Sequence, residues 1–380
     1  MSQPRIVLAG GGTGGHVAPA IALAEEWALR YGRNSVLFLC SGNDLERKMI
    51  GHAGFNFAAA PVARPKGSIT SKLNSLASCA RAVPKAAKII RDFGAIGVVG
   101  AGGYASLPGV AAAGSIRRLP VALLEANVVP GRVTRLASRF AKVCYAHLPL
   151  SRKIACRVAV RGNPVRQAFR LPISRQEARC ALRIDQFKRT LLVFGASQGA
   201  SGINRAVLEA IPLLKLERDR LQVLHITGAA DVDKARAMWR ESGIAHRCAA
   251  FTHLMPLWMS AADVAISRSS ASSISELAAT GVGMLLVPLP SSADGHQAAN
   301  AELVQSRGAG VYVPQASLDG EELATLLDRY LFDEASCARL AAGSRAVAKP
   351  EAAVEIVDAL EAEFGISKGR DFAEKGKRAA

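Results

Sequence analysis

Short apolar runs alternate with amphipathic stretches along most of the chain. The apolar runs lie at residues 5–8, 35–40, 95–99, 120–124, 189–194, 221–228, 262–267 and 284–288. Runs of this length that are rich in Val, Ile, Leu and Ala are typical of parallel strands buried on both faces. Because helical patterns separate the runs, we expect repeated strand–helix units and an α/β fold.

The first of these units contains a loop that is rich in glycine. Five of the six residues from Gly10 to Gly15 are glycines, and an amphipathic helix is predicted from Pro19 to Arg30. Such a loop lets the backbone approach a ligand and directs helix N–H groups at it, which indicates a site for an anion, most simply a diphosphate. His16 lies where the helix N-terminus disfavours the cationic ring, so the neutral ring can accept a proton. A tight turn whose glycines serve only packing is the alternative.

The same loop also fits a second class of site. Gly10, Gly12 and Gly15 satisfy the spacing G-x-G-x-x-G of nicotinamide and flavin oxidoreductases. A dinucleotide site requires an acidic residue at the close of the second strand, where it holds a ribose, and this strand closes with Cys-Ser-Gly. Asp44 and Glu46 follow shortly after, so the oxidoreductase interpretation is weakened and stays open.

The pattern of strand, glycine loop and helix recurs in both halves of the chain. Further glycine loops follow the strands that end at Val99 and Phe194, and the second of these restarts the whole pattern. At 380 residues the chain exceeds the size at which one core keeps growing. We therefore expect two doubly wound domains, residues 1–160 and 161–350, that face each other across a cleft, and a mobile tail at 366–380.

Polar side chains follow several of the predicted strands, at the edge where parallel sheets bind ligands. They are Glu125 and Asn127 after one strand, Ser272, Ser273 and Glu276 after another, and Gln297 in the loop beyond a third. The serines can donate to a phosphate, and Glu276 can accept two hydroxyls of a ribose. Ordinary helix capping, with a serine at the N-cap and Glu276 as the capping-box acid, explains the second group equally well.

The positive charge is concentrated in the first half of the chain. The net charge is +17, and residues 1–160 hold 21 Lys and Arg against 6 Asp and Glu, whereas residues 161–380 hold 27 against 25. A basic amphipathic stretch at 61–92, extended by Arg117 and Arg118, indicates contact with an anionic membrane, because apolar burial adds to about 1 kcal/mol per nearby Lys or Arg. Nucleic acid is disfavoured, since the stretch lacks stacking aromatic residues. A merely solvated basic face is the alternative.

The rest of the composition favours a cytoplasmic protein. The sequence shows no run of 18 apolar residues and no secretion signal. Its seven cysteines form no Cys-x-x-Cys pair, so we expect free or buried thiols rather than disulfides or a metal site.

Taken together, these motifs resemble those of the MurG family of glycosyltransferases. They occur in the family's order and are GGTGGH at 11–16, GGY at 102–104, GNPVR at 162–166, GASQGA at 195–200 and SELA at 275–278. The resemblance implies a GT-B fold of two Rossmann-like domains, in which a last helix at 351–365 completes the first domain. It also implies inverting transfer of N-acetylglucosamine from UDP-N-acetylglucosamine to lipid I, the undecaprenyl-diphospho-muramoylpentapeptide, giving lipid II in peptidoglycan synthesis. No metal or other cofactor is expected, and the enzyme is expected as a peripheral protein on the cytoplasmic face of the cell membrane.

The resemblance places the donor mainly on the second domain. The matching residues there are Glu276 for the ribose, Ser272 and Ser273 for the diphosphate, Gln297 for the sugar, the backbone of Thr252 for the uracil, and Arg166 and Ser197 near the nucleotide sugar. In the first domain the residues expected to close over the donor are Thr13, Gly14, Gly15 and Asn127. His16 is the candidate base for the acceptor hydroxyl, and Glu125 is a weaker candidate.

Several positions depart from the family's usual pattern. The usual HEQN is LEAN at 124–127, Ser270 and Ser273 replace a Gly and a Thr, and Gly295 precedes His296. These departures concern acceptor contacts more than donor binding, because the glycine loops and Glu276 are intact. Two alternatives therefore stay open, a GT-B enzyme that acts on another glycolipid and a catalytically silent, membrane-associated binding module.

Overall fold

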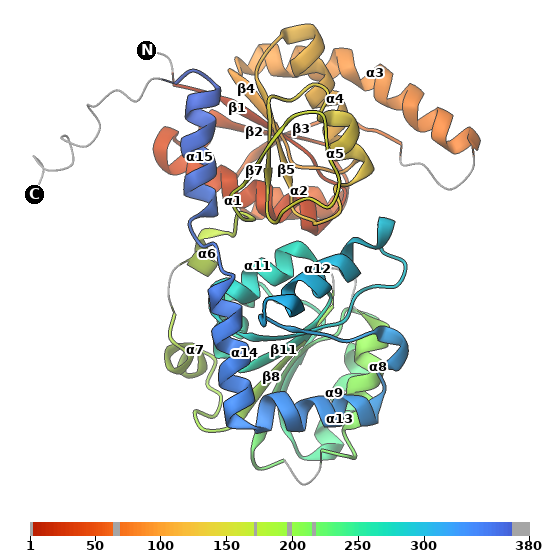
Figure 1. The fold of residues 1–380 in the computed structure, drawn as a ribbon, viewed down its shortest axis with the longest axis vertical. Helices are drawn as coiled ribbons and strands as arrows, with labels where there is room; N and C mark the ends of the chain where they lie inside the picture. Colours follow the sequence, from red (N-terminus) through yellow and green to blue (C-terminus); the bar gives the residue numbers. More distant parts are fainter. Residues whose placement is uncertain (1–2, 64–68, 171–172, 196–199, 215–217, 367–380) are drawn as a thin grey trace, which may run out of the picture.

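The computed structural model describes residues 3–63, 69–170, 173–195, 200–214 and 218–366. In this part of the chain two parallel sheets form, each with helices on both faces, and the two domains lie one above the other (Figure 1). The predicted α/β fold of two doubly wound domains is confirmed. The predicted tail at 366–380 lies, apart from Ile366, outside the described residues.

The elements of the first domain open the chain. Its strands are β1 (Ile6–Ala9), β2 (Val36–Cys40), β3 (Asn56–Ala59), β4 (Gly97–Gly100), β5 (Val121–Glu125), β6 (Val143–Ala146) and β7 (Arg157–Val160). Its helices are α1 (Gly14–Tyr31), α2 (Asp44–His52), α3 (Ile69–Phe93), α4 (Leu107–Ala111), a π-helical segment (Ala112–Arg117) and α5 (Arg132–Ala137).

The second domain follows a short linker. Its strands are β8 (Arg189–Phe194), β9 (Leu221–Ile226), β10 (Ala245–Ala249), β11 (Val264–Ser267), β12 (Gly283–Leu286) and β13 (Val311–Tyr312). The helices of the linker and this domain are α6 (Gln167–Arg170), α7 (Arg175–Ala181), α8 (Ser201–Ala210), α9 (Val232–Ser242), α10 (Met255–Ala261), α11 (Ala271–Thr280), α12 (His296–Ser306), α13 (Gly320–Leu327) and α14 (Glu334–Ala346). Strands β3, β6, β7, β10 and β13 lie outside the apolar runs of the sequence, and four of these are edge strands.

In both sheets the strand order reverses at the first strand of the domain. The order is β3-β2-β1-β4-β5-β6-β7 in one sheet and β10-β9-β8-β11-β12-β13 in the other. Ala9 at the end of β1 pairs with Leu39 on one side and Gly100 on the other. Because parallel strands end at the same edge, the glycine loops after β1 and β4 leave the sheet side by side. Such reversal points are where open α/β sheets bind ligands.

The core of each domain is aliphatic. Every residue of β1, β4, β5, β8 from Thr190 onward, β11 and β12 is buried, which confirms strands covered on both faces. Large aromatic residues are few, and Trp27 and Trp239 are the largest fully buried side chains. This composition follows from the low aromatic content of the sequence.

The last helix, α15 (Ala352–Glu363), leaves the second domain and packs on the first (Figure 1). Ile356, Val357 and Leu360 join the same buried cluster as β1 and α1. Arg30 on α1 donates to Asp358 and Glu361 of this helix over 2.8 and 2.9 Å. The domains are therefore connected twice, by the linker and by this helix.

The first helix begins at Gly14, five residues before the predicted start at Pro19. The prediction was wrong here because a proline and two glycines ordinarily end helical patterns. Pro19 is tolerated because it lies close to the N-terminus, where few N–H groups have intrahelical partners. His16 is consequently part of the first helical turn rather than of the loop.

Candidate active site

The first glycine loop and His16 form one packed unit with the second glycine loop. Thr13 is the N-cap of α1, and its Oγ1 lies 3.1 Å from Nδ1 of His16. The half-buried ring lies against the loop after β4, since a Cβ built on Gly102 would be 2.8 Å from the ring's Cδ2, and one on Gly103 would be 3.3 Å from Nδ1. A side chain at Gly102 would collide with the ring, and the positive φ of both residues, 90° and 72°, also favours glycine.

One of the loop N–H groups predicted to face a diphosphate already has a hydrogen-bond partner within the protein. Gly12 donates its backbone N–H to Oε1 of Glu46 over 2.5 Å, and the Glu46 side chain is fully buried. A second anion at Gly12 would meet this carboxylate, so the predicted anion role narrows to the N–H groups of Gly14 and Gly15 at the start of α1. The same burial removes Glu46 as a ribose ligand, which weakens the oxidoreductase alternative further.

Glu125, the weaker candidate base, lies at the end of β5 with both oxygens engaged. Its Oε1 accepts from the backbone and side-chain nitrogens of Asn127 over 3.0 and 3.1 Å. Its Oε2 accepts from the N–H of Gly131 over 3.0 Å and from the hydroxyl of Thr134 over 2.5 Å. A buried carboxylate that receives four hydrogen bonds from one loop is suited to shaping that loop rather than to taking a proton from a substrate.

Asn127 is joined to the second domain by a buried amide. Asn300 on α12 is fully buried, and its Nδ2 donates to Oδ1 of Asn127 over 3.1 Å and to the carbonyl of Ser269 over 3.2 Å. Its Oδ1 accepts the N–H of Val128 over 3.1 Å. Through Asn300, the loop that carries Asn127 is thus fixed to α12 and to the turn that follows β11 in the second domain.

Helix α11 presents the hydroxyl-rich turn. Ser270 is its N-cap and accepts the N–H of Ser273 over 3.2 Å, while its hydroxyl lies 2.8 Å from that of Ser273 and 3.3 Å from that of Ser272. The capping explanation therefore holds for the serine cluster. It does not hold for Glu276, which lies one turn beyond the position of a capping-box acid.

Glu276 and Arg166 form a direct pair. Nη2 of Arg166 donates to Oε1 of Glu276 over 3.2 Å, and the carboxylate side chain is only 12% exposed. Burial raises the pKa of Glu276, and the charge and hydrogen bond of Arg166 oppose that rise. The pair joins the linker after β7 to α11, so two residues predicted for the nucleotide sugar meet here.

The remaining predicted residues take different positions. Thr252 lies in the loop after β10, where its hydroxyl accepts the N–H of Leu254 over 3.0 Å. Gln297 is buried in the first turn of α12, and its Oε1 accepts the N–H of Leu289 over 2.9 Å. Ser197 lies outside the described residues.

The two halves of the candidate site meet at the domain boundary. Helices α1 and α11 contact each other there, and Arg132 donates to Asp294 across the same boundary over 3.2 Å. The rings of His52 and His253 stack with their centroids 4.5 Å apart. The boundary thus holds Thr13 and His16 on one side and the Arg166–Glu276 pair on the other.

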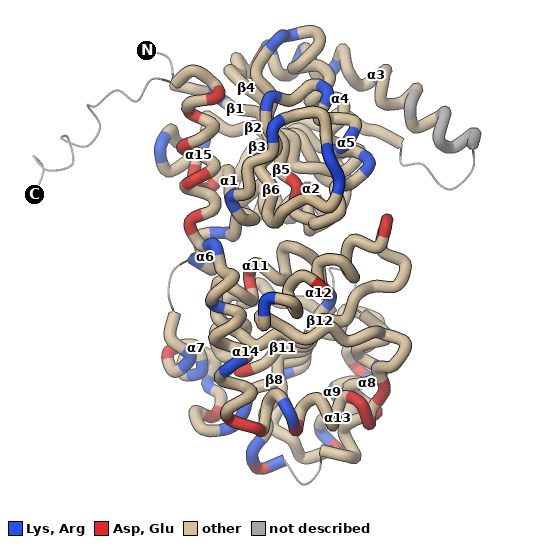
Figure 2. Tube along the Cα trace, viewed as in Figure 1, with Lys and Arg blue, Asp and Glu red and all other residues tan. Residues whose placement is uncertain are grey.

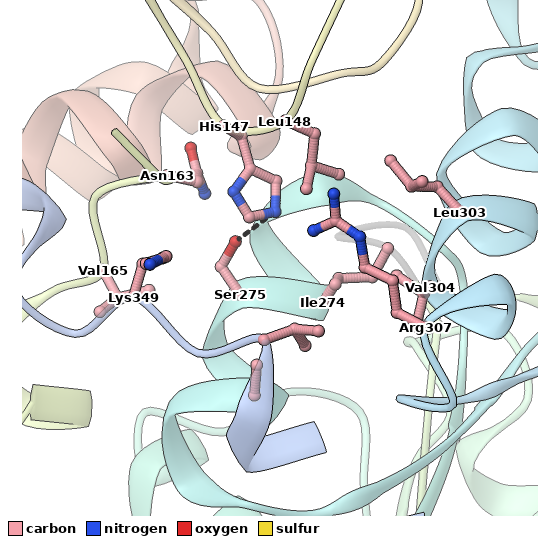
Figure 3. A pocket seen from close by; sticks show the side chains of 12 residues that line it. His147, Leu148, Asn163, Val165, Ile274, Ser275, Leu303, Val304, Arg307 and Lys349 are labelled. Atoms are coloured by element: carbon pink, nitrogen blue, oxygen red, sulfur yellow. Dashed lines mark hydrogen bonds between the residues drawn. The ribbon is translucent and has the colours of Figure 1, made fainter. Parts of the chain in front are cut away.

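A small cavity adjoins α11 on the linker side. About 20 Å³ of it is open to the centre of a water molecule, which is room for about one water. Figure 3 shows His147 and Asn163 in its wall, with Nε2 of His147 3.4 Å from the hydroxyl of Ser275. Among the described residues, nothing pairs with the buried Nδ1 of His147 or Nδ2 of Asn163, and none of the predicted site residues lines the cavity. Most of its lining residues are apolar, and we regard it as a packing gap between the domains and not as the active site.

Sequence reasoning did not assign the observed roles of two residues that organise this site, Asn300 and Glu46. Asn300 has a local signal, since it lies three positions after Gln297 on the same helix. Glu46 completes a capping box with Asn43, a pattern that can be read from the sequence, but its bond to Gly12 cannot.

Comparison with known proteins gives a consistent assignment along the chain. Residues 6–146 match the glycosyltransferase family 28 N-terminal domain, and residues 190–356 match the glycosyltransferase family 28 C-terminal domain. Two similar proteins, from Syntrophus aciditrophicus and Anaeromyxobacter sp. strain Fw109-5, are named UDP-N-acetylglucosamine–N-acetylmuramyl-(pentapeptide) pyrophosphoryl-undecaprenol N-acetylglucosamine transferase. They are 34% and 36% identical over 93% of this chain and over 97% and 92% of their own lengths. The crystal structure of Acinetobacter baumannii MurG superposes with a TM-score of 0.74 at 25% identity, over 94% of this chain and all of that one.

Proposed function

The chain belongs to the MurG family of glycosyltransferases, and from this we propose that it transfers N-acetylglucosamine from UDP-N-acetylglucosamine to lipid I, which gives lipid II for peptidoglycan synthesis. The single observation that carries this proposal is that relatives with this named activity match 93% of the chain at 34–36% identity. The described geometry supports the proposal, because the candidate base and the residues proposed to bind the ribose and the diphosphate lie at one domain boundary.

The transfer we propose is a single displacement. The neutral ring of His16 takes the proton of the acceptor hydroxyl, and the hydroxyl oxygen forms a bond to C1 of the sugar. The bond from C1 to the diphosphate oxygen breaks, UDP leaves with that electron pair, and the configuration at C1 inverts. In this proposal Nδ1–H of His16 donates to the Thr13 hydroxyl oxygen, 3.1 Å away, which leaves the lone pair of Nε2 free to accept the proton.

The donor is held by the second domain in this proposal. Glu276 accepts the ribose hydroxyls, and Arg166 keeps its carboxylate oriented through the 3.2 Å hydrogen bond. The first turn of α11 offers backbone N–H groups and the hydroxyls of Ser272 and Ser273 to the diphosphate, where the helix dipole favours the charge that develops on leaving UDP.

A direct assay tests the proposed function. Purified protein is incubated with radiolabelled UDP-N-acetylglucosamine and a soluble lipid I analogue, and the product is identified by mass and by release of UDP. Transfer from UDP-N-acetylglucosamine and not from UDP-glucose supports the proposal. Donor binding without turnover would favour a silent binding module, and transfer only to another glycolipid would favour a different acceptor.

We propose further that the first domain rests on the cytoplasmic face of an anionic membrane. Within the described residues no helix is both long and apolar enough to span a bilayer. Figure 2 shows Lys and Arg spread over this domain around α3, α4 and α5. On α3, Arg81, Lys85 and Lys88 are exposed at helical spacing, which places them on one face.

The apolar part of this surface differs from the prediction. Ile90 on α3 is fully buried in the core of its own domain, so it is not available to insert into lipid. Exposed apolar side chains lie instead at Ile116, which is 54% exposed, and at Phe140, which is 38% exposed. The two segments are in contact, since a Cβ on Gly114 would lie 2.9 Å from that of Phe140. Exposed Arg117, Arg118, Arg139 and Lys142 flank them.

A further inference from the structure

We propose that Glu46 is a positioning residue for the transfer reaction, which it serves by holding the first glycine loop, and through that loop His16, in place. This inference rests on the proposed function. Glu46 makes none of the substrate contacts that we assign, and it is fully buried behind the loop. Its role follows from the groups that its carboxylate holds.

The carboxylate joins two segments that are far apart in the sequence. Oε1 accepts the N–H of Gly12 over 2.5 Å, and the hydroxyl of Ser41 lies 2.9 Å from Oε1 and 2.8 Å from Oε2. Oε2 accepts the N–H of Gly42 over 2.7 Å and that of Asn43 over 3.1 Å. The loop after β1 is therefore attached to the loop after β2 through one side chain, and hydrogen bonds to a charged group are worth about 1.5–3 kcal/mol each.

The attachment is transmitted to His16 by direct packing. A Cβ on Gly11 would overlap the Glu46 carboxylate, so the backbone lies directly on that group. On its other side, a Cβ on Gly103 would overlap the carbonyl oxygen of Gly11, so the second glycine loop rests on the first. The ring of His16 lies against this second loop. A shift of Gly11 and Gly12 therefore changes the wall against which the ring is held.

A glutamine at position 46 cannot reproduce these bonds. An amide has one accepting oxygen and one donating NH₂ group, whereas both oxygens of Glu46 accept backbone N–H groups. In one orientation the NH₂ group would face Gly42 and Asn43 and meet two backbone donors. In the second orientation it would face Gly12 and meet one backbone donor. The second orientation is the less costly, so Glu46→Gln releases the glycine loop while leaving the start of α2 bonded.

The matched control removes the other half of the same capping box. Asn43 accepts the N–H of Glu46 through Oδ1 over 2.9 Å, so Asn43→Ala weakens the start of α2 but leaves the carboxylate on Gly12. We expect Glu46→Gln to lower kcat at least tenfold and to raise the KM for UDP-N-acetylglucosamine by a smaller factor, since the second domain supplies most of the donor contacts that we assign. Asn43→Ala should keep kcat within twofold. Equal losses in the two variants, or a change in donor KM alone, would overturn the proposal.

A second readout does not depend on turnover. Amide hydrogen exchange at Gly12 should become at least tenfold faster in Glu46→Gln and stay unchanged in Asn43→Ala, and unchanged exchange in both would refute the attachment. If the wild type transferred no N-acetylglucosamine, the proposed function would fail. The hydrogen-exchange measurement would still show whether Glu46 holds the glycine loop. Should Glu46→Gln fail to fold, Glu46→Asp retains the charge but is one methylene shorter, and we expect it to lose kcat and Gly12 protection alike.

Discussion

Arg166 and Glu276, the two residues proposed to hold the nucleotide sugar, are hydrogen-bonded to each other over 3.2 Å. The guanidinium of Arg166 also lies over the ring of Phe169, 4.9 Å from its centroid. A buried carboxylate is costly unless it is paired, so Arg166 favours the charged form of Glu276 that the proposed ribose contact requires.

Replacing Glu276 by alanine should weaken donor binding. The loss should be about 1.5–3 kcal/mol, or roughly 10–150-fold in Kd, which is the range for hydrogen bonds to a charged group. Calorimetric titration with UDP-N-acetylglucosamine measures it. Thr280→Ala, one turn along the same helix, serves as the control and should leave Kd unchanged. A folded Glu276→Ala protein with wild-type affinity would contradict the ribose role.

Donor affinity should fall at a higher pH than for an ordinary carboxylate. Burial raises the pKa of Glu276, and the ribose contacts need its ionised form, so affinity is full above that pKa and decreases as pH drops through it. Arg166→Gln removes an opposing charge and should raise the pKa further. Titrations from pH 8 to pH 4.5 should show the decrease begin earlier in this variant. The same midpoint in both proteins would speak against the pair as the cause.

Removal of the His16 ring should affect turnover more than binding. A positioned base is commonly worth about 10²–10⁴-fold, so His16→Ala should lower kcat by that factor while Kd for the donor changes little. Single-turnover and binding measurements on the same preparation separate the two effects. If His16 only contacts the donor, the variant would instead lose affinity and keep its turnover at saturation, and the base would have to be sought elsewhere.

Mild acid should destabilise the protein through His147. Burial, assisted by the charge of Arg307, lowers its pKa to about 4, whereas an unfolded histidine has a pKa of about 6.5. The unfolded chain binds this proton first, so the stability is complete above about pH 6.5 and is lost as pH falls from there toward 4. Between pH 7 and pH 5 the loss should be at most about 2 kcal/mol.

Urea unfolding of the wild type and of His147→Gln at both pH values tests this expectation. The variant should lack this share of the pH dependence. A second buried histidine, His225, lies inside the second domain and not at the domain boundary, and burial lowers its pKa to about 4 as well. Its share of the pH dependence should remain in His147→Gln. Identical pH dependence in the wild type and His147→Gln would refute the assignment.

Membrane binding should depend on the basic face of α3. Changing Arg81, Lys85 and Lys88 to Gln should weaken the free energy of binding to anionic vesicles by about 3 kcal/mol, or roughly 100-fold in affinity, at about 1 kcal/mol per charge. Co-sedimentation with the vesicles measures this change. The control changes three exposed arginines of the second domain, namely Arg205, Arg218 and Arg329. Salt should weaken wild-type binding too, since exposed charges are screened over about 8–10 Å. Binding unaffected by both treatments would point to apolar insertion or a protein partner.

Much of the fold could be predicted from the sequence because its signals are local. The apolar runs fix most of the buried strands, and the strand at 189–194 was predicted with its observed bounds. The glycine loops mark the strand–helix junctions. The sequence left open whether Glu276 is a capping-box acid, and only the observed N-cap at Ser270 excludes that role. The start of α1 was misplaced because Pro19 weakens the local helical signal without ending the helix.

The contacts that join the site were decided only by the tertiary structure. Gly12 and Glu46 are 34 residues apart, Arg166 and Glu276 are 110 apart, and Asn127 and Asn300 are 173 apart. Each pair meets because strand order and domain packing bring distant loops together, and no local pattern encodes that distance. The sequence by itself therefore determined which chemical groups are available to the candidate site. The tertiary structure decided which of them are already bonded to the protein, as Glu46 and Glu125 are, because a buried carboxylate must find its hydrogen-bond donors wherever the fold places them.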